Sequence, residues 1–262
     1  GNIGNATMTA SRTQAYEFGF NVQVGRHWAF SIMGWVKDMD QLVTAKSYRS
    51  GIYEYMVSAN GDYATATGID FTLENRGLLV NTMLQYTYSK AVGNGDYDQG
   101  AFGTQYVNAP SQQYMMYYDR THDLTLSMYT YLPFGITAGM TAFYQSGYPY
   151  TPIKWNGDKP ESDLLNKNTL RSDDHMWANL SFSKSVDFSD FKLYFGLTID
   201  NLFNNVNAYD FYDITGQPDD PGDYYTDFIG QSDGGVSSAY YDRPWYVSAP
   251  REFNFFMRFD YK

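Results

Sequence analysis

Apolar and polar residues alternate along most of this chain of 262 residues. Such alternation predicts β-strands with one apolar face, because successive side chains of a strand point to opposite sides of a sheet. The last segment is the clearest, with Phe253, Phe255, Met257, Phe259 and Tyr261 on one face and mostly polar residues between them. Similar segments cover residues 16–24, 28–36, 69–73, 78–88, 124–132, 136–144, 176–182 and 191–199. The pattern therefore predicts roughly nine strands.

Most of these segments are long for a soluble protein. Strands in soluble domains usually have about 5–6 residues, whereas a strand that crosses a membrane in a barrel needs about 9–11. The second face carries Asn, Gln, Thr, Ser and Gly, which suits a water-filled lumen. Tyrosine and tryptophan near strand ends predict interfacial girdles. These girdle candidates are Trp28, Tyr86, Tyr88, Tyr131, Tyr144 and Trp177.

The connections between the strands alternate in length. Short turns are expected at 25–26, 76–77, 133–135 and 187–190, and long polar loops at 41–62, 91–120, 147–172 and 202–250. Transmembrane barrels have this asymmetry, with short periplasmic turns and longer extracellular loops. In a Greek-key sandwich, short and long connections are not expected to alternate so regularly. The pattern predicts an all-β antiparallel transmembrane barrel, and a soluble sandwich is the less favoured alternative.

The strand count bears on domain organisation. If the long loops are extracellular, nine strands that end in the periplasm begin outside, whereas bacterial single-chain barrels have even strand numbers. We therefore expect residues 1–262 to form the C-terminal portion of a longer barrel. A strand hidden in 202–250 or in 41–62, where Leu42, Val43 and 52–57 are partly strand-like, is the alternative. Residues 1–13 lack the basic and apolar segments of a signal peptide.

Composition removes several other classes of protein. Aromatic residues make up 19% of the chain, which argues against disorder. No apolar run reaches the roughly 18 residues of a membrane-spanning helix. Cysteine is absent, which excludes disulfides, thiolate metal sites and cysteine nucleophiles. A net charge of -11 disfavours nucleic acid as a partner.

Six motifs, in the same order along the chain, resemble the C-terminal half of TonB-dependent outer-membrane receptors, especially those of Bacteroidetes-like bacteria. They are YEFGF at 16–20, WVKDMDQLV at 35–43, YDRTHDL at 118–124, YQSGYPYTP at 144–152, DNLFNN at 200–205 and PREF at 250–253. Together they extend over nearly the whole chain. The chain ends on Lys262 after Tyr261, whereas the family usually ends on an aromatic residue.

The resemblance implies a barrel of about 22 strands that is closed by an N-terminal plug domain. It also implies an outer-membrane location in a Gram-negative bacterium and uptake of a scarce nutrient, such as a siderophore, an oligosaccharide or a peptide, with energy from TonB. The expected partners are outer-membrane lipid, the nutrient ligand, TonB through a plug domain that this chain lacks, and a surface lipoprotein. The alternative is a barrel that does not transport and anchors or scaffolds a surface complex. We expect no enzyme activity, no catalytic residues and no cofactor.

Two groups of residues invite a catalytic interpretation. Asp173, Asp174 and His175 resemble the acidic and histidine residues that outer-membrane proteases carry at a barrel rim, but charged residues are ordinary where a strand begins after a loop. His122 with its neighbouring aspartates is similar, and a Ser-His-Asp arrangement requires spatial evidence. We interpret both groups as structural. His27 is expected to be solvated at a short turn, and three histidines without cysteine make a zinc site improbable.

The long loops carry two further candidates. The acidic run at 218–223, with Asp227 and Asp233 beyond it, offers oxygen ligands for calcium, but it lacks EF-hand spacing and a solvated loop is favoured. Loop aromatics either pack the loops together or line an extracellular ligand vestibule. The vestibule candidates are Tyr53, Tyr55, Tyr97, Tyr106, Tyr148, Tyr150, Trp155, Tyr224, Tyr225 and Trp245.

Overall fold

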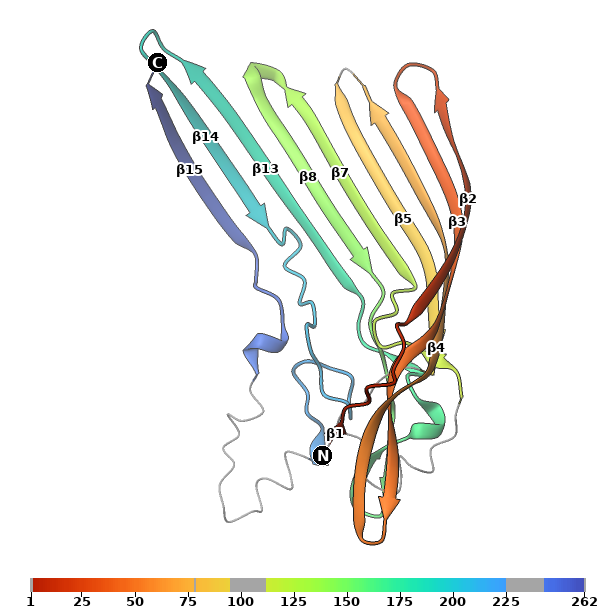
Figure 1. The fold of residues 1–262 in the computed structure, drawn as a ribbon. Coiled ribbons are helices and arrows are strands. Elements are labelled where there is room, and N and C mark those ends of the chain that lie inside the picture. Colours follow the sequence, from red (N-terminus) through yellow and green to blue (C-terminus); the bar gives the residue numbers. More distant parts are fainter. Residues whose placement is uncertain (1, 78, 95–111, 225–242, 262) are drawn as a thin grey trace.

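Nine long strands form one curved antiparallel sheet (Figure 1). The computed structural model describes residues 2–77, 79–94, 112–224 and 243–261. The main strands are β2 (Arg12–Val24), β3 (Trp28–Ser50), β4 (Tyr53–Arg76), β5 (Val80–Gly93), β7 (His122–Leu132), β8 (Ile136–Gln145), β13 (His175–Asp187), β14 (Phe191–Asp200) and β15 (Glu252–Tyr261). Each pairs with the next in chain order. The predicted number of long strands is confirmed.

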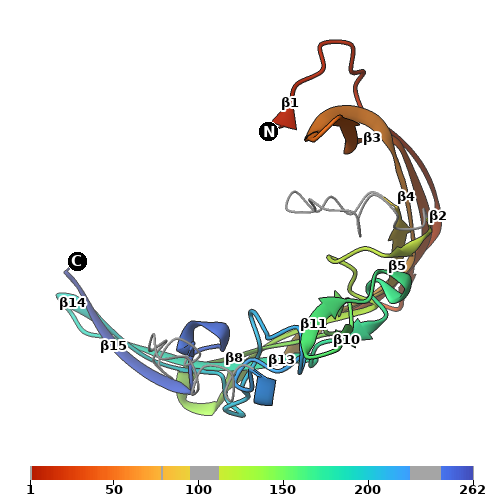
Figure 2. The same cartoon turned by 90° about the horizontal axis from the view of Figure 1, so that it is seen from below.

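The sheet is rolled into an open arc (Figure 2). Because the nine strands alternate in direction, β2 and β15 at the two edges run the same way (Figure 1). The short connections lie at one end of the sheet, and the long connections extend from the other end. We call these the turn end and the loop end. Among the described residues, no helix is long and apolar enough to cross a membrane.

The four predicted short turns lie at the turn end. Val24 and Trp28 close the first, and Asp187 and Phe191 close the last. A 3-10 helix, η1 (Pro133–Gly135), makes the turn between β7 and β8. His27 is exposed at the first turn, where its Nδ1 donates to the Arg76 carbonyl oxygen at 2.9 Å. The turn predictions are confirmed.

The prediction of a loop at 41–62 is wrong. β3 and β4 have 23 and 24 residues and continue past their neighbours as a two-stranded hairpin with its turn at Gly51. The register shifts around Gln41, which has a positive φ of 56°, so a β-bulge separates the sheet from the projecting hairpin. The strand-like character of 42–43 and 52–57 therefore reflects longer strands and no additional one.

Short elements occupy the remaining loops. They are β1 (Asn2–Ile3), β6 (Tyr114–Met115), β9 (Pro149–Tyr150), β10 (Ile153–Asn156), β11 (Lys159–Ser162), η2 (Leu164–Asn166), β12 (Leu170–Arg171) and η4 (Pro244–Tyr246). β1 pairs with β4 in parallel, and β10 pairs with β11. In the described part of 202–250, the only strand pairing is an isolated bridge between Ala208 and Val247.

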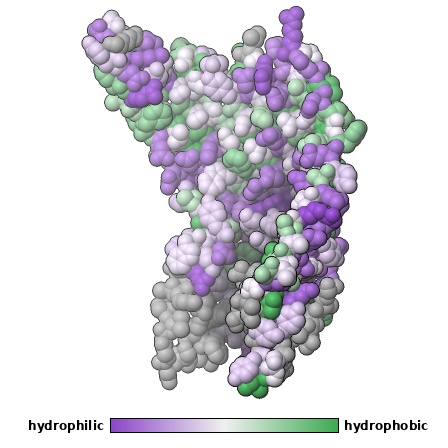
Figure 3. All heavy atoms as spheres, in the orientation of Figure 1, coloured by the Kyte–Doolittle hydropathy of each residue, from purple (hydrophilic) through white to green (hydrophobic). Residues whose placement is uncertain are grey.

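The two faces of the sheet differ in polarity, as the alternation predicts. Cross-strand pairing places Phe20, Ile32, Phe71 and Tyr86 side by side on the convex face. Apolar side chains on this face are widely exposed, with Phe18 at 84%. Hydrophilic residues spread across the concave face (Figure 3). A soluble sheet would hide its apolar face under another layer, so this arrangement is typical of a sheet whose convex side meets lipid.

Two of the girdle candidates point the other way. Trp177 pairs with Phe143, and its indole nitrogen donates to Asn179 on the concave face. Tyr131 pairs with Thr137 on the same face. Both residues occupy the polar phase of their strands, so the alternation itself excludes them from a lipid-facing girdle.

Candidate functional site

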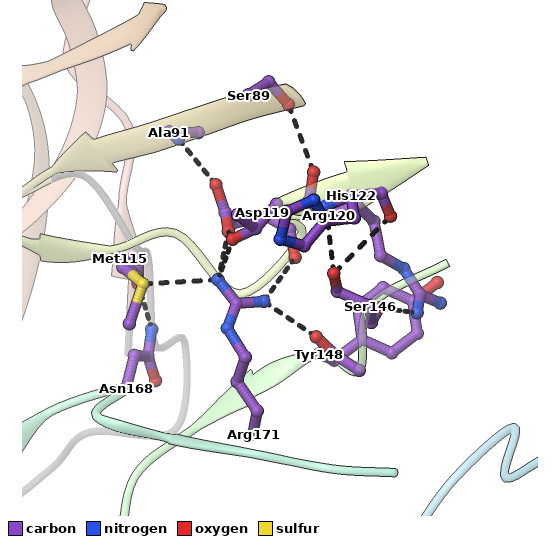
Figure 4. Close-up of polar contacts among 12 residues, drawn as sticks. Ser89, Ala91, Met115, Asp119, Arg120, His122, Ser146, Tyr148, Asn168 and Arg171 are labelled. Atoms are coloured by element: carbon purple, nitrogen blue, oxygen red, sulfur yellow. Dashed lines mark hydrogen bonds and ion pairs between the residues drawn. The ribbon is translucent and has the colours of Figure 1, made fainter. Parts of the chain in front are cut away.

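A buried carboxylate organises the loop ends of β5, β7 and β8. Asp119 is only 2% exposed. Its Oδ1 accepts from the backbone nitrogen of Ala91 at 2.6 Å, and its Oδ2 accepts from Thr121 Oγ1 at 3.1 Å and from Arg171 (Figure 4). A buried charge is tolerated only when it is paired and hydrogen-bonded. The aspartate of the YDRTHDL motif is therefore a structural centre of this rim.

Arg171 connects four segments that are distant in the chain. Besides Asp119, its guanidinium donates to the Gly147 carbonyl at 2.8 Å, to Thr121 Oγ1 at 2.7 Å and to Met115 Sδ at 3.3 Å (Figure 4). One side chain from β12 thus holds β6, the start of β7 and the loop after β8 together. Arg171 lies outside the YDRTHDL and YQSGYPYTP motifs, so these motifs do not indicate from sequence that it is the partner of Asp119.

A second arginine, Arg120, stacks on the ring of Tyr148, one of the vestibule candidates. The Arg120 guanidinium lies 3.4 Å from the centre of the Tyr148 ring and donates to the Ser146 carbonyl oxygen. The Tyr148 ring also meets His175 edge to face at 6.0 Å. Tyr148 is therefore a half-buried residue that packs at the base of the loop after β8, and Arg120 covers one face of its ring.

His122, Asp119 and Asp123 do not converge. His122 lies on the convex face, where its Nδ1 is 2.8 Å from the Tyr86 hydroxyl. Asp123 points to the concave face and accepts from Gln145 Nε2 at 2.7 Å. The backbone nitrogen of His122, and not its ring, contacts Ser146 Oγ. This geometry offers no nucleophile with a base, which agrees with the structural interpretation.

The side chains of Asp174 and His175 also have separate surroundings. Asp174 accepts from the Tyr144 hydroxyl at 2.6 Å and from the Gly147 backbone nitrogen at 3.0 Å. The hydrogen bond from Tyr144 lowers the pKa of Asp174. His175 begins β13 on the concave face, and its Nε2 is buried without a hydrogen-bond partner among the described residues. The segment is the start of a strand, as expected.

The DNLFNN motif forms a second buried polar centre. Asn201 is 1% exposed and has a positive φ of 51°. Its Nδ2 donates to the carbonyls of Asn205 at 2.9 Å and Ala249 at 3.0 Å, and its Oδ1 accepts from the Asn205 nitrogen at 3.0 Å. Asn179 Oδ1 accepts from the backbone nitrogen of Asn201 at 2.9 Å. The motif ties the loop after β14 to the segment that enters β15.

The remaining vestibule candidates do not form one cluster. Tyr53 stands at the tip of the β3–β4 hairpin and is 73% exposed, while Tyr55 stacks on Tyr48 at 5.8 Å. Trp245 is exposed beside Tyr246. Tyr97, Tyr106 and Tyr225 lie outside the described residues. A vestibule role for the set remains a prediction.

Two aromatic contacts join separate loops. Trp155 in β10 meets Tyr224 at 5.2 Å, and Tyr150 in β9 meets Phe211 at 5.0 Å. The loop between β8 and β13 therefore packs on the loop between β14 and β15. Sequence alone gives no sign of these pairings.

The acidic run at 218–223 contains a local hydrogen bond between a side chain and the backbone. Asp220 Oδ1 accepts from the Gly222 nitrogen at 2.9 Å. Among the residues that the structure describes, no three His, Cys, Asp or Glu side chains form a group suited to a metal. Asp227 and Asp233 lie outside those residues. The calcium hypothesis stays a prediction.

The concave wall contains hollows that the sequence does not reveal, and two of them exceed 500 Å³. One has a volume of about 560 Å³ and is lined by Glu74, Asn81, Thr141 and Asp200, among others. The other is about 540 Å³, and the residues that line it are mainly from β2, β3, β4 and β5. Both are lined largely by polar side chains of the concave face.

Comparison with solved structures decides the fold. The outer membrane transporter YddB of Escherichia coli matches 100% of this chain with a TM-score of 0.64 at 11% identity. The ferric-catecholate import receptor Fiu of E. coli K12 matches 98% with a TM-score of 0.59 at 13% identity. The FrpB iron transporter of Neisseria meningitidis matches 78% with a TM-score of 0.52 at 12% identity.

The chain has the fold of an outer-membrane transporter barrel. This confirms the all-β antiparallel wall of an outer-membrane barrel that the resemblance to TonB-dependent receptors implies, whereas the barrel of about 22 strands and the plug domain stay predictions. The transporter-like sheet spans only part of such a protein, since it covers 34% of YddB, 29% of Fiu and 29% of FrpB. No protein-family model matches the sequence, and no curated protein matches it significantly.

Proposed function

We propose that the chain forms part of the barrel wall of an outer-membrane receptor that takes up a scarce nutrient with energy supplied by TonB. The observation that carries this proposal is the pairing of an exposed apolar convex face with a polar concave face on strands of membrane-crossing length. The similarity to transporters of known structure supports it.

The sheet requires further strands to close. β2 and β15 run in the same direction, so joining them directly, or joining β15 to β2 of a second copy, would place parallel strands in an antiparallel barrel. An odd number of added strands restores alternation around the ring. This supports residues 1–262 as a portion of a larger barrel.

The loop end is built to hold a firm extracellular rim. The Asp119–Arg171 ion pair and the Asn201 hydrogen bonds fix the bases of three loops, from which exposed aromatic side chains project. We infer that ligand capture occurs on these loops, above the concave wall. Siderophore, oligosaccharide and peptide remain the candidate nutrients.

An uptake experiment tests the proposal. Cells that make the complete protein and cells that lack it should be compared for growth on, and accumulation of, single radiolabelled nutrients from the three classes. We expect one class to depend on the protein, and that dependence to vanish when TonB is removed. Unchanged uptake of every class, together with stable co-purification of a surface lipoprotein or filament, would instead support the scaffold role.

A further inference from the structure

A hairpin at the loop end projects beyond the neighbouring strands of the sheet (Figure 1). It consists of residues 42–60 at the junction of β3 and β4, and we call it the rim hairpin. The register of its two strands is regular from Val43 to the turn, so the rim hairpin can move as one body. Its tip is open to solvent, with Ile52 at 87% and Tyr53 at 73% exposure.

Two consecutive bulges join the rim hairpin to the sheet. Between Met39 and Val43 the register shifts twice, first by an extra residue in β3 and then by an extra residue in β4, Gly61. Gln41, in the first bulge, has a positive φ of 56°. Bulges interrupt the hydrogen-bond ladder and bend a strand, and a positive φ is uncommon outside glycine. The ladder is therefore weakest where the rim hairpin leaves the sheet, and this place has the character of a hinge.

The N-terminal segment crosses this hinge. β1 pairs with the outer edge of β4 in the rim hairpin, at Met56 and Val57, and this is the one parallel pairing among the strands that the structure describes. β2 instead pairs with the outer edge of β3, beginning at Asp40. Residues 4–11, which connect β1 to β2, must therefore pass from one edge of the hairpin to the other. We call residues 4–11 the strap.

The side chain of Asn60 fastens the strap to the hinge. Its Oδ1 accepts from the backbone nitrogen of Thr9 at 2.8 Å, and its Nδ2 donates to the Thr9 carbonyl oxygen at 2.9 Å. This amide thus satisfies both backbone groups of Thr9, as a neighbouring strand would. The same Nδ2 donates to the Gln41 carbonyl oxygen in the bulge at 2.8 Å. One side chain of β4 therefore connects the strap with the bulged part of β3.

Two hydroxyl groups of the strap add to this fastening. Thr9 Oγ1 donates to Gln41 Oε1 at 3.0 Å, and Ser11 Oγ donates to the Gln41 carbonyl oxygen at 3.1 Å. These hydrogen bonds, like those of Asn60, are exposed to solvent. Water competes for such groups, so each bond contributes only a modest net stabilisation. A segment held in this way opens locally while the rest of the sheet stays folded.

We propose that the strap is a latch that fixes the angle of the rim hairpin, with Asn60 as the fastening residue, and that the hairpin swings about its two bulges when the strap is released. A few residues at the end of an element can absorb the backbone change of such a hinge. The strap lies across the hinge and bonds to Gln41 within it, so release of the strap frees the hinge. The swing moves Ile52 and Tyr53 relative to the other loops of the rim.

Hydrogen exchange in the complete protein in lipid vesicles measures release of the strap. Asn60→Leu removes the partner of both backbone groups of Thr9, so we expect amide exchange in the strap to accelerate about tenfold or more. The matched control is Thr7→Ala, which removes a hydrogen bond within the strap, from Thr7 Oγ1 to Asn5, and leaves the contacts of Asn60 in place. Exchange of the Thr9 amide in this control should stay within about twofold of the wild-type rate.

Distances between two spin labels measure movement of the rim hairpin itself. The chain has no cysteine, so labels can be attached to cysteines introduced at Ile52 on the tip and at Asp173, an exposed residue just before β13. We expect one narrow distance distribution in the otherwise unchanged protein and in Thr7→Ala. In Asn60→Leu the distribution should become at least about twice as wide, because the hinge is no longer held.

A second variant of Asn60 keeps the size of the side chain. Asn60→Asp retains an oxygen that accepts from the Thr9 nitrogen, but it replaces the donor to the carbonyl oxygens of Thr9 and Gln41 by a second acceptor. Oxygen then faces oxygen at both places, so this variant should also speed exchange in the strap and widen the distance distribution. Heat-modifiable gel migration confirms that each variant contains a folded barrel.

Two results would overturn the inference. One is faster exchange in the strap of both Asn60 variants with an unchanged distance distribution, which would make the strap a fraying segment that does not hold the hairpin. The other is wild-type exchange in both variants, which would show that Asn60 does not fasten the strap. Either result can occur while uptake still depends on the protein and on TonB, so the latch can fail without the transport proposal.

Discussion

The carboxylate of Asp119 is buried, and its ion-pair partner, Arg171, comes from a strand in the next long loop. This contact joins the YDRTHDL segment to the loop after β8. It is a largely buried ion pair between two loops at the loop end of the sheet. The extracellular architecture that we propose depends on it.

Removal of Arg171 should destabilise the protein strongly. Arg171→Met leaves the Asp119 charge buried without its partner, which costs about 3–5 kcal/mol of unfolding free energy. Urea unfolding in detergent measures this cost. The control is Arg12→Met, which breaks the exposed Arg12–Asp40 pair and should destabilise the protein far less, because exposed ion pairs contribute little to stability. Equal costs would contradict the assignment of Asp119 as a structural centre.

Asn201 should be replaceable by neither alanine nor glycine. Asn201→Ala loses three hydrogen bonds of the side chain and keeps an unfavourable positive φ, whereas Asn201→Gly relieves only the backbone. We expect Asn201→Gly to cost about 1–3 kcal/mol and Asn201→Ala to cost more. Proteolysis of the loop after β14 should accelerate in both. Wild-type resistance in Asn201→Ala would show that the hydrogen bonds do not hold the loop.

Gly68 is required because the Trp35 indole lies directly against it. A Cβ on Gly68 would come within 2.4 Å of the Trp35 ring, so Gly68→Ala should cost about 1–3 kcal/mol and shift tryptophan fluorescence. Gly34→Ala is the control, since its nearest neighbour would be 4.0 Å away. Adding Trp35→Ala should rescue Gly68→Ala. A Gly68→Ala protein as stable as Gly34→Ala would show that the indole moves away freely.

The Tyr144–Asp174 hydrogen bond should make loop-end stability depend on acid pH. The bond lowers the pKa of Asp174 in the folded protein, so its stabilisation is fully present above the unfolded value of 3.8 and is lost as pH falls through the lower folded value. Asp174→Asn should flatten this part of the stability curve, measured by urea unfolding between neutral and strongly acid pH. Asp173→Asn, at the exposed neighbouring carboxylate, should retain the wild-type slope. An unchanged slope in Asp174→Asn would contradict the assignment.

Much of the fold could be predicted from the alternation of residues. The strands, the four short turns and the polarity of each face follow from a period of two, which any residue on a strand must obey. The extension of β3 and β4 could not be predicted, because Gly51, Asn60 and Gly61 are typical loop residues and a bulge at Gln41 breaks the register.

The candidate site was less accessible to prediction. The YDRTHDL and DNLFNN motifs mark the buried centres, but the partners of Asp119 and Asn201 are set by which loops meet in space. The vestibule aromatics show the same limit, because Trp155 and Tyr224 pair across two loops.

The central claim is that the convex face meets lipid and the concave face meets water. The chain has no cysteine, so single substitutions place unique fluorescent labels. Neighbouring residues on opposite faces serve as matched controls. One pair is Leu126 on the convex face and Ser127 on the concave face, and the other is Phe255 on the convex face and Asn254 on the concave face. In lipid vesicles that contain the complete protein, a lipid-borne quencher should reach labels at 126 and 255, and an aqueous quencher should reach those at 127 and 254. Equal quenching of neighbours, or aqueous quenching at 126 and 255, would contradict the account.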